Sequence, residues 1–182
     1  MLKKSFIHIP GMSKEKEKAL WDAGIDSWET LLDADQTNLP FPLKESVRQE
    51  LVDSINHFEK GNLDYFEGRL PRNQYWRVYH HLKEKCCFLD IETTGLSRER
   101  DIITIIGVYD GKESKVFIEG KNMHLFPKEI AKYDVVVTFN GACFDLPFIK
   151  SKNPSLNLPK FHIDLRYALK NLGYSGGLKL IE

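Results

Sequence analysis

Residues 86–96 read CCFLDIETTGL, and this stretch is the most informative one for the fold of its domain. Its apolar run is typical of a short buried strand. Alternate residues of a strand point to the same face, so Asp90 and Glu92 should project together. Leu89 and Ile91 should then point the other way, into a core. We therefore expect an apolar strand that presents two carboxylates on one of its faces.

Two neighbouring carboxylates on an apolar strand repel each other and resist the loss of water. A divalent cation between them would relieve both costs. Oxygen-only ligands favour Mg²⁺ or Mn²⁺ over zinc. The alternative is a solvated sheet edge that carries two surface acids. Because the strand is short, apolar and expected to be central, we favour the metal-binding interpretation.

The sequence that follows this strand predicts a mixed sheet. Residues 101–111 (DIITIIGVYDG) and 115–120 (KVFIEG) read as two more strands, and their short connections make all three strands antiparallel neighbours. Then come a short helix at 127–133, a buried strand at 135–140, a helix from Leu146, a strand at 161–165 and a helix at 167–172. This order predicts the α/β class, with antiparallel strands first, parallel strands after them, and flanking helices.

The domain organisation is expected to have three parts. Residues 1–62 have helical spacing with turns and predict a small helical module. Residues 63–85 are rich in aromatic side chains and are expected to link this module to the next domain and to pack against it. Residues 86–182 form the α/β domain.

The segment 9–32 (IPGMSKEKEKALWDAGIDSWETLL) resembles a helix-hairpin-helix element. In that element a glycine-containing turn offers backbone N–H groups to a phosphate. Ser13 stands where the hairpin usually has its second glycine. The alternative is a small packing module with Trp21 and Trp28 in its core, and both interpretations stay open.

Composition and charge narrow the function classes. Hydrophobic residues make up 42% and charged residues 29%, as in soluble globular proteins. No apolar run has the length of a membrane span or secretion signal, so the expected location is cytoplasmic, with no membrane partner. The 26 basic and 26 acidic residues give a net charge of zero, which does not favour strong binding of long nucleic acid. It is compatible with an acidic metal pocket that holds one strand end.

A third carboxylate, Asp145, follows the buried strand at 135–140, in the stretch NGACFDLPFI (140–149). An Asp before Leu-Pro is a good helix N-cap, and Asn-Gly is a common turn signal. If the preceding strand lies beside the first one, Asp145 would instead reach the pocket of the first two acids. The sequence leaves both roles open.

The two motifs together resemble a known family. FLDIETTGL (88–96) looks like the first motif of the DEDD (DnaQ-like) 3′–5′ exonucleases of the ribonuclease-H-like superfamily, and NGACFDLPFI resembles their second motif. The flanking sequence is similar to the YprB-like branch, and the likeness runs from near Leu70 to the end. It implies a ribonuclease-H-like fold and phosphodiester hydrolysis at single-stranded DNA or RNA 3′ ends, with two Mg²⁺ or Mn²⁺ ions.

The resemblance also implies roles for individual residues. Asp90 would bridge both metals, Glu92 would hold the metal that activates water, and Asp145 would act at the second metal. The terminal nucleotide would lie against Thr93, Thr94, Gly95, Leu96, Asn140 and Phe144. An Asn-Gly turn explains Asn140 nearly as well.

The family's fourth carboxylate and its His or Tyr base have no counterpart here. Asp164 is too close to the second motif to be that ligand, and its alternation with His162 on a strand indicates a structural role. Glu182 is terminal and is not assigned as a ligand. We therefore expect a domain that is incomplete at its C-terminus.

An incomplete domain has two consequences. Activity should be reduced, so the alternative function is a noncatalytic nucleic-acid-binding or protein-interaction module that retains the nuclease fold. The apolar surface left without its helix could also recruit a partner or a second copy of the chain.

Overall fold

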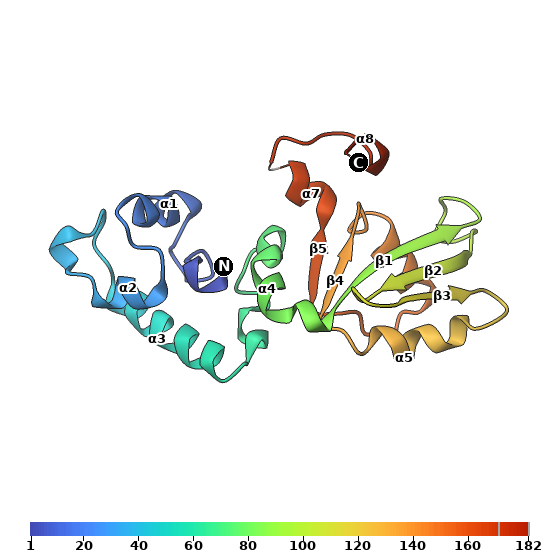
Figure 1. Cartoon of the computed structure of the whole chain (residues 1–182), viewed down its shortest axis with the longest axis horizontal. Coiled ribbons are helices and arrows are strands. Elements are labelled where there is room, and N and C mark those ends of the chain that lie inside the picture. The colour runs from blue at the N-terminus through green and yellow to red at the C-terminus, as the bar shows by residue number, and fades with distance from the viewer. Residues whose placement is uncertain (171, 182) are drawn as a thin grey trace. The chain divides into compact units, whose positions relative to one another are not determined.

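The computed structural model describes residues 1–170 and 172–181. The chain divides into two compact units, Met1–Val78 and Tyr79–Glu182. Figure 1 shows that the first unit is helical and that the second is built around one sheet. Each unit buries its own set of large apolar side chains. Among the described residues, no helix is both long and apolar enough to cross a membrane.

The N-terminal unit is built from helices α1 (Lys14–Asp22), α2 (Trp28–Asp33) and α3 (Glu45–Glu59). Short 3₁₀ turns span Leu2–Lys4, Gln36–Asn38, Leu63–Phe66 and Arg72–Val78. Helix α1 begins where Ser13 caps it, since its side chain accepts a hydrogen bond from the backbone N–H of Lys16. Residue 13 therefore acts as a helix cap in this unit.

The core of the N-terminal unit surrounds Trp28, which is fully buried. Its ring stacks on Phe66 with 5.5 Å between centroids and meets His8 at 5.3 Å. Trp21 is 39% exposed. Of the two tryptophans that the packing-module alternative places in a core, Trp28 is buried, whereas the indole N–H of Trp21 donates to the carbonyl of Lys4 near the surface.

The C-terminal unit contains a five-stranded sheet of order β3-β2-β1-β4-β5. Its strands are β1 (Cys86–Thr93), β2 (Ile103–Tyr109), β3 (Ser114–Ile118), β4 (Val135–Thr138) and β5 (Phe161–Asp164). Strands β1, β2 and β3 pair antiparallel, whereas β4 runs parallel to β1 and β5 parallel to β4. The predicted α/β class and the order of antiparallel and then parallel strands are confirmed.

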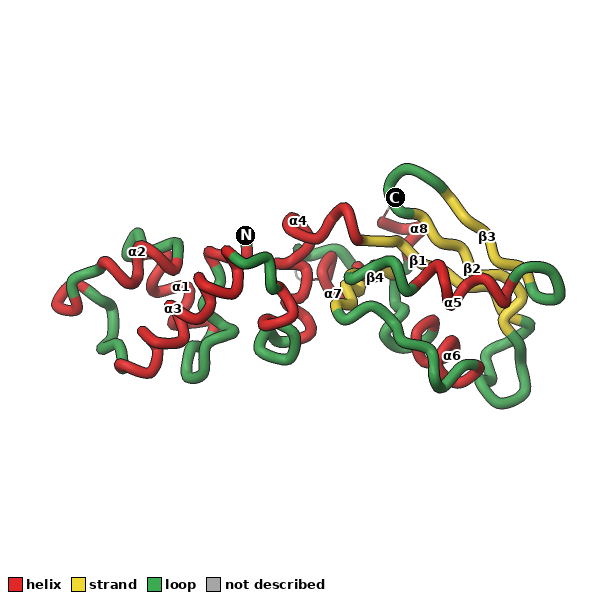
Figure 2. The backbone as a smooth tube through the Cα atoms, turned by 90° about the horizontal axis from the view of Figure 1, so that it is seen from below, coloured by secondary structure: helices red, strands yellow, loops and turns green. Residues whose placement is uncertain are grey.

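Two of the helices of the C-terminal unit, α5 (Phe126–Ile130) and α6 (Asp145–Lys152), cover one face of the sheet (Figure 2). The unit also contains α4 (Tyr79–Leu82), α7 (Leu165–Lys170) and α8 (Leu178–Ile181), with 3₁₀ turns at Lys83–Lys85 and Met123–Leu125. Helices α5 and α6 lie on the same side of the sheet (Figure 2), and their apolar residues join one core with Leu89 and Ile91 of β1. The predicted inward direction of these two β1 residues is confirmed.

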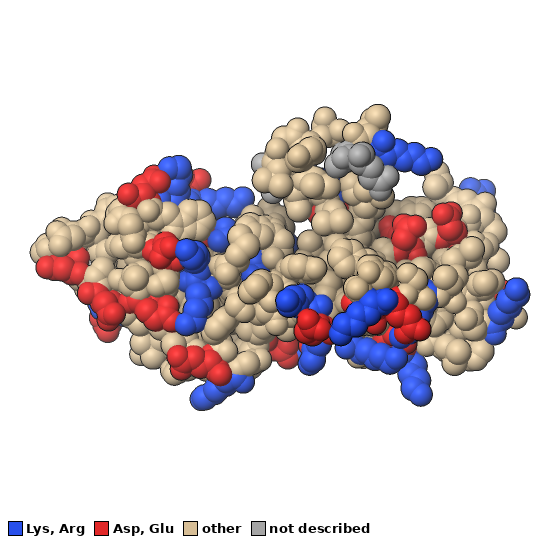
Figure 3. Space-filling model, viewed as in Figure 1, with Lys and Arg blue, Asp and Glu red and all other residues tan. Residues whose placement is uncertain are grey.

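The opposite face of β1–β3 is open to solvent. Phe88, Asp90 and Glu92 alternate along it as exposed residues of β1. Phe88 lies opposite Tyr109 of β2, and these side chains are 37% and 44% exposed. In the space-filling view the surface over these strands is mostly uncharged, with acidic side chains set into it (Figure 3). The two acids of the first motif therefore lie on an open, largely apolar face.

Candidate metal centre

The central contact of the site joins the two acidic motifs. Pairing between β1 and β4 ends at Phe88 and Val137, so the rest of β1 has no strand on that side. The backbone N–H of Ile91 instead donates to Oδ1 of Asp145 at 3.2 Å. Ile91 lies between Asp90 and Glu92 in the chain. The carboxylate of the second motif is therefore fixed against the strand that carries the first motif.

This contact excludes one of the two roles considered for Asp145, that of a helix N-cap, and leaves its role as a metal ligand a prediction. Helix α6 begins at Asp145, and its N-cap position is Phe144, which makes no side-chain cap. The Asp145 side chain is turned to β1, and only 4% of the residue is exposed. The N-cap interpretation is therefore wrong, because a packed neighbouring strand offers this carboxylate a buried N–H donor.

Burial and mutual repulsion disfavour the charged forms of two of these acids. Burial is the largest cause that raises the pKa of Asp145, to about 6, and the negative charge of Asp90 raises it further. Loss of hydration, and then the charge of Glu92, raise the pKa of Asp90. Asp90 is thus electrostatically coupled to an acid on each side of it. Carboxylates with raised pKa values next to one another mark functional sites.

The donor set matches a hard divalent cation in its chemistry, since all three groups offer carboxylate oxygens. A cation would compensate the buried charge of Asp145, which has no Lys or Arg partner among the described residues. In the part of the chain that the structure describes, however, no three acidic, His or Cys side chains lie close enough to hold a metal ion. The charge of Asp90 acts on Asp145 and that of Glu92 acts on Asp90, so the three acids are neighbours in pairs and not one gathered set.

The turn before Asp145 is held by Asp164, a residue that was not predicted to belong to the site. Asn140 adopts a left-handed conformation with φ of 65°. Its backbone N–H and that of Ala142 donate to the two carboxylate oxygens of Asp164, at 2.8 and 3.0 Å. Asp164 ends β5, the neighbour of β4, so it reaches this turn from the same edge of the sheet. Its position at the end of a strand was the signal for this role.

The same turn leaves no room for a larger residue at Gly141. A Cβ atom there would lie 2.3 Å from Oγ1 of Thr138. That hydroxyl already accepts from the Gly141 N–H at 3.1 Å and contacts Nε2 of His162 at 2.8 Å. The structural role predicted for Asp164 is thus seen in its contacts with the turn, and His162 adds a contact through Thr138.

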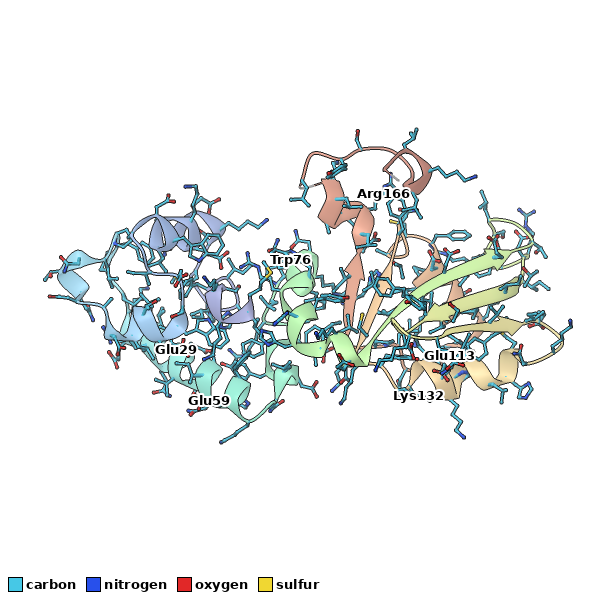
Figure 4. The ribbon with its side chains drawn as sticks, viewed as in Figure 1. Glu29, Glu59, Trp76, Glu113, Lys132 and Arg166 are labelled. Carbon is cyan, nitrogen blue, oxygen red and sulfur yellow. The ribbon has the colours of Figure 1, made fainter. Side chains whose placement is uncertain are left out.

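Two arginines also reach this turn. Arg98, in the loop between β1 and β2, donates through Nη2 to the carbonyl of Cys143 at 2.6 Å. Arg166 of α7 donates through Nη1 to Oδ1 of Asn140 at 2.6 Å. Figure 4 shows Arg166 projecting from α7 toward the end of β4. Asn140, a predicted substrate contact, therefore has its side-chain oxygen occupied by this guanidinium.

The predicted nucleotide-contacting residues after Glu92 form a braced loop. Thr93 donates through its hydroxyl to the Gly95 carbonyl at 2.7 Å. The carboxylate of Asp101 accepts from the Thr94 hydroxyl at 3.2 Å, and a Cβ on Gly95 would meet it at 2.6 Å. These contacts make the loop compact and explain the glycine.

Leu96 and Phe144 differ in exposure. Leu96 is 84% exposed and so available for an external contact. Phe144 is partly buried and packs on the core through Phe148, with 5.6 Å between ring centroids. The connection between Arg98 and Cys143 links the loop that bears Leu96 to the turn that bears Phe144. The six predicted substrate residues thus lie on two connected loops, and their roles remain predictions.

The sequence of this unit matches a known family. A sequence profile of the RNase H superfamily matches residues 87–182, which is more than half of the chain. The chain belongs to the RNase H superfamily. No curated protein sequence matches the chain significantly.

Solved structures give weaker likenesses. The family B DNA polymerase of Pyrobaculum calidifontis is 23% identical over 41% of this chain and 11% of its own, with a TM-score of 0.33. Brucella melitensis NrnC bound to pGG is 19% identical over 57% and 53% of the two chains, with a TM-score of 0.42. The Aedes aegypti Nibbler EXO domain is 9% identical over 54% and 52%, with a TM-score of 0.41. The chain thus spans about half, or much less, of each of these structures.

The family's fourth carboxylate was not assigned from the sequence, and Asp164 does not replace it. Its oxygens accept from the backbone N–H groups of Asn140, Ala142 and Arg166. Glu182, which was also not assigned as a ligand, lies outside the described residues. Asp90, Glu92 and Asp145 remain the predicted metal ligands, and the structure brings Asp145 to β1 between the other two.

Proposed function

We propose that this RNase H superfamily protein is a metal-dependent 3′–5′ exonuclease that hydrolyses phosphodiester bonds at single-stranded nucleic-acid ends. One observation carries the proposal. The buried carboxylate of Asp145 is fixed against β1 at Ile91, between the two acids of the first motif. A buried, unpaired carboxylate beside two more acids is unfavourable unless a cation or a proton compensates it. The resemblance of both acidic motifs to DEDD exonucleases supports the choice of reaction.

The proposed cofactor is Mg²⁺ or Mn²⁺, held by Asp90 and Asp145 with Glu92 completing the site. Two such ions supply Lewis acidity and an activated water for in-line phosphodiester hydrolysis. The protein's own part is to hold the carboxylates and the strand end. The Ile91 N–H orients Asp145, and the turn anchored by Asp164 sets its position. The loops bearing Leu96 and Phe144 are the proposed nucleotide contacts, with DNA and RNA as alternative substrates.

A second candidate function has its own support. No three metal-binding side chains are gathered in the described chain. Phe88, Ile105, Tyr109 and Val116, each between 37% and 49% exposed, share one open sheet face. An apolar face of this kind is typical of interaction surfaces. The alternative is therefore a noncatalytic nucleic-acid-binding or protein-interaction module that keeps the nuclease fold.

Cleavage of end-labelled substrates separates the two functions. Single-stranded DNA and RNA carrying a 5′ label would be incubated with the chain and Mn²⁺ or Mg²⁺. We expect a ladder that shortens from the 3′ end, lost in Asp90→Asn. The matched control is Glu119→Gln, which removes an exposed carboxylate from the end of β3 in the same unit.

The comparison of variants makes the result decisive. A ladder in the wild type and in Glu119→Gln, but not in Asp90→Asn, supports the exonuclease. Equal cleavage by Asp90→Asn would indicate a contaminating nuclease and contradict the proposal. No cleavage by a folded wild-type chain with either metal would favour the noncatalytic module.

A further inference from the structure

Two guanidinium groups converge on the turn that precedes Asp145. Arg98 holds the carbonyl of Cys143 and Arg166 holds the side chain of Asn140, each at 2.6 Å. The turn itself is closed by a hydrogen bond from the Cys143 N–H to the Asn140 carbonyl at 3.2 Å. Two positive charges from separate parts of the sequence, the β1–β2 loop and α7, therefore meet at one short turn next to the buried acid.

Most of the hydrogen-bonding capacity of these groups is unused. A guanidinium has five N–H donors, and each of these two has one donor bonded to an uncharged oxygen. Both residues are exposed, and neither is in a salt bridge within residues 1–170 and 172–181. Charge and donors remain available for a ligand.

Two carboxylates close to these arginines in the chain, Asp164 and Asp101, are bonded to other groups. Asp164, two residues before Arg166, accepts from three backbone N–H groups. Asp101, three residues after Arg98, accepts from the Ser97 N–H and the Thr94 hydroxyl. Neither of these two carboxylates forms an ion pair with Arg98 or Arg166, so they do not compensate the positive charges beside the turn.

We propose that Arg98 and Arg166 together form a phosphate-binding clamp for the backbone of single-stranded nucleic acid, a role that rests on the proposed function of the site. Arginine is suited to this ligand because its planar donors match phosphate oxygens two at a time. Phosphate contacts position a strand without reading its sequence. The clamp would hold a phosphate next to Asp145, in line with a protein that grips one strand end and has no net positive charge.

A purely bracing role explains less of the arrangement. The turn is already anchored by the Asp164 carboxylate, by Thr138 and by its own internal hydrogen bond. Bonds to a carbonyl and an amide oxygen need donors but not a full positive charge. Two unpaired charges at this place are explained by an anionic ligand.

Salt-dependent binding tests the clamp without relying on cleavage. Fluorescein-labelled oligothymidylate and oligouridylate would be titrated in EDTA over a range of salt concentrations, with anisotropy as the readout. Each single-strand phosphate contact contributes about 0.7 to the slope of log affinity against log salt. We expect Arg98→Gln and Arg166→Gln each to reduce the slope by about 0.7 and the double variant by about twice that. Preference between the two oligonucleotides would identify the nucleic acid.

Matched controls come from the same two segments. Arg100→Gln removes an exposed charge from the β1–β2 loop, and Lys170→Gln removes one from α7. Both should keep the wild-type slope, and Arg98→Lys should restore part of the affinity that Arg98→Gln loses. Hydrogen exchange of α6 checks that the turn stays folded in each variant.

Three outcomes would overturn the clamp: no oligonucleotide binding by the wild type, unchanged slopes in Arg98→Gln and Arg166→Gln, or equal losses in the two control variants. The binding assay contains no metal and measures no hydrolysis. A chain that cleaves nucleic acid while both variants keep the wild-type slope would retain the exonuclease and exclude the clamp. A chain that fails to cleave but shows the expected slopes would keep the clamp and remove the catalytic function.

Discussion

Two buried carboxylates, one in each unit, have opposite surroundings. Glu17 of the N-terminal unit is 1% exposed and Asp145 of the C-terminal unit is 4% exposed. Glu17 forms a 2.7 Å ion pair with Arg77 and accepts from the backbone N–H of Phe6 at 2.6 Å. Asp145 accepts from the Ile91 N–H, but no cation pairs with it in the described residues.

The difference separates an acid whose charge is paired within the fold from an acid whose charge is not. The charge of Glu17 is compensated within the folded chain, so its removal should harm only the fold. The charge of Asp145 opposes folding, as its raised pKa indicates, and acids with raised pKa values are common at functional sites. Glu17 and Asp145 therefore predict opposite signs for the effect of removing their charge on stability.

The largest expected effect is the loss of the Glu17 charge. Glu17→Gln leaves Arg77 buried without a counter-charge and should destabilise the N-terminal unit by about 3–5 kcal/mol. Trp21, Trp28 and Trp76 all lie in this unit, so tryptophan fluorescence during urea unfolding reports on it selectively. Replacing both partners, as in Glu17→Met with Arg77→Met, should recover much of the loss. If Glu17→Gln alone is as stable as the wild type, Glu17 does not stabilise the fold through its ion pair with Arg77.

The second effect is an acid sensitivity of the same unit, caused by His8. Burial, then the charges of Arg69 and Arg77, lower the pKa of His8 from 6.5 to about 3. Between these values the unfolded chain binds a proton that the folded chain does not, so stability falls as the pH falls below 6.5. The loss should reach about 2 kcal/mol at pH 5.

Urea unfolding followed by tryptophan fluorescence at pH 7.5 and pH 5 measures this effect, with His8→Gln as the control that should lose most of the pH dependence. The His8 ring is 3% exposed and bonds Ser54 at 2.8 Å, a contact that a Gln side chain can approximate. An equal loss of stability in both proteins would show that other groups carry the acid sensitivity.

The third effect has the opposite sign and concerns the C-terminal unit. Asp145→Asn removes the unfavourable charge and keeps an acceptor for the Ile91 N–H. We expect a gain of about 1–2 kcal/mol, less than the full shift because Asn buries an amide N–H₂ group. The gain should be fully present above pH 6 and should vanish below pH 3.8, where the wild-type acid is protonated in both states.

Hydrogen exchange of the β1 and β4 amides at neutral pH measures the stability of this unit, which contains no tryptophan. Asp134→Asn, with an exposed pair to Lys85, is the matched control and should give no gain. Destabilisation by Asp145→Asn would place this acid with Glu17 as a structural residue.

The sequence predicted the sheet well because strands leave a local signature. The alternation at residues 86–93 matched the observed burial of β1. The predicted strand at 101–111 contains β2, and the one at 115–120 covers β3 except for Ser114. The start of α6 was harder to predict. An Asp before Leu-Pro is typical of a helix N-cap, but an Asp after a buried strand could also be a metal ligand. Its role depends on β1, which is 54 residues away in the chain.

The part of the site that the sequence did not predict is made of long-range contacts. Arg98 meets Cys143 across 45 residues and Arg166 meets Asn140 across 26. No periodic pattern links such positions, because they become neighbours only when β4 is placed between β1 and β5. The acidic motifs could be recognised in the sequence, whereas the hydrogen bonds of Arg98 and Arg166 to the turn before Asp145 could not.

The proposal that Asp90 and Asp145 hold a divalent cation can be tested through the effect of Mn²⁺ on the stability of the C-terminal unit. Hydrogen exchange of β1 would be measured with and without the metal in the wild type, Asp145→Asn, Asp90→Asn and Glu119→Gln. A ligand at 100 times its Kd stabilises the folded state by about 2.7 kcal/mol. If both Asp residues bind the metal, we expect such a gain in stability in the wild type and in Glu119→Gln, and none in the two Asp variants. No gain in the wild type, or an equal gain in Asp145→Asn, would contradict the proposal.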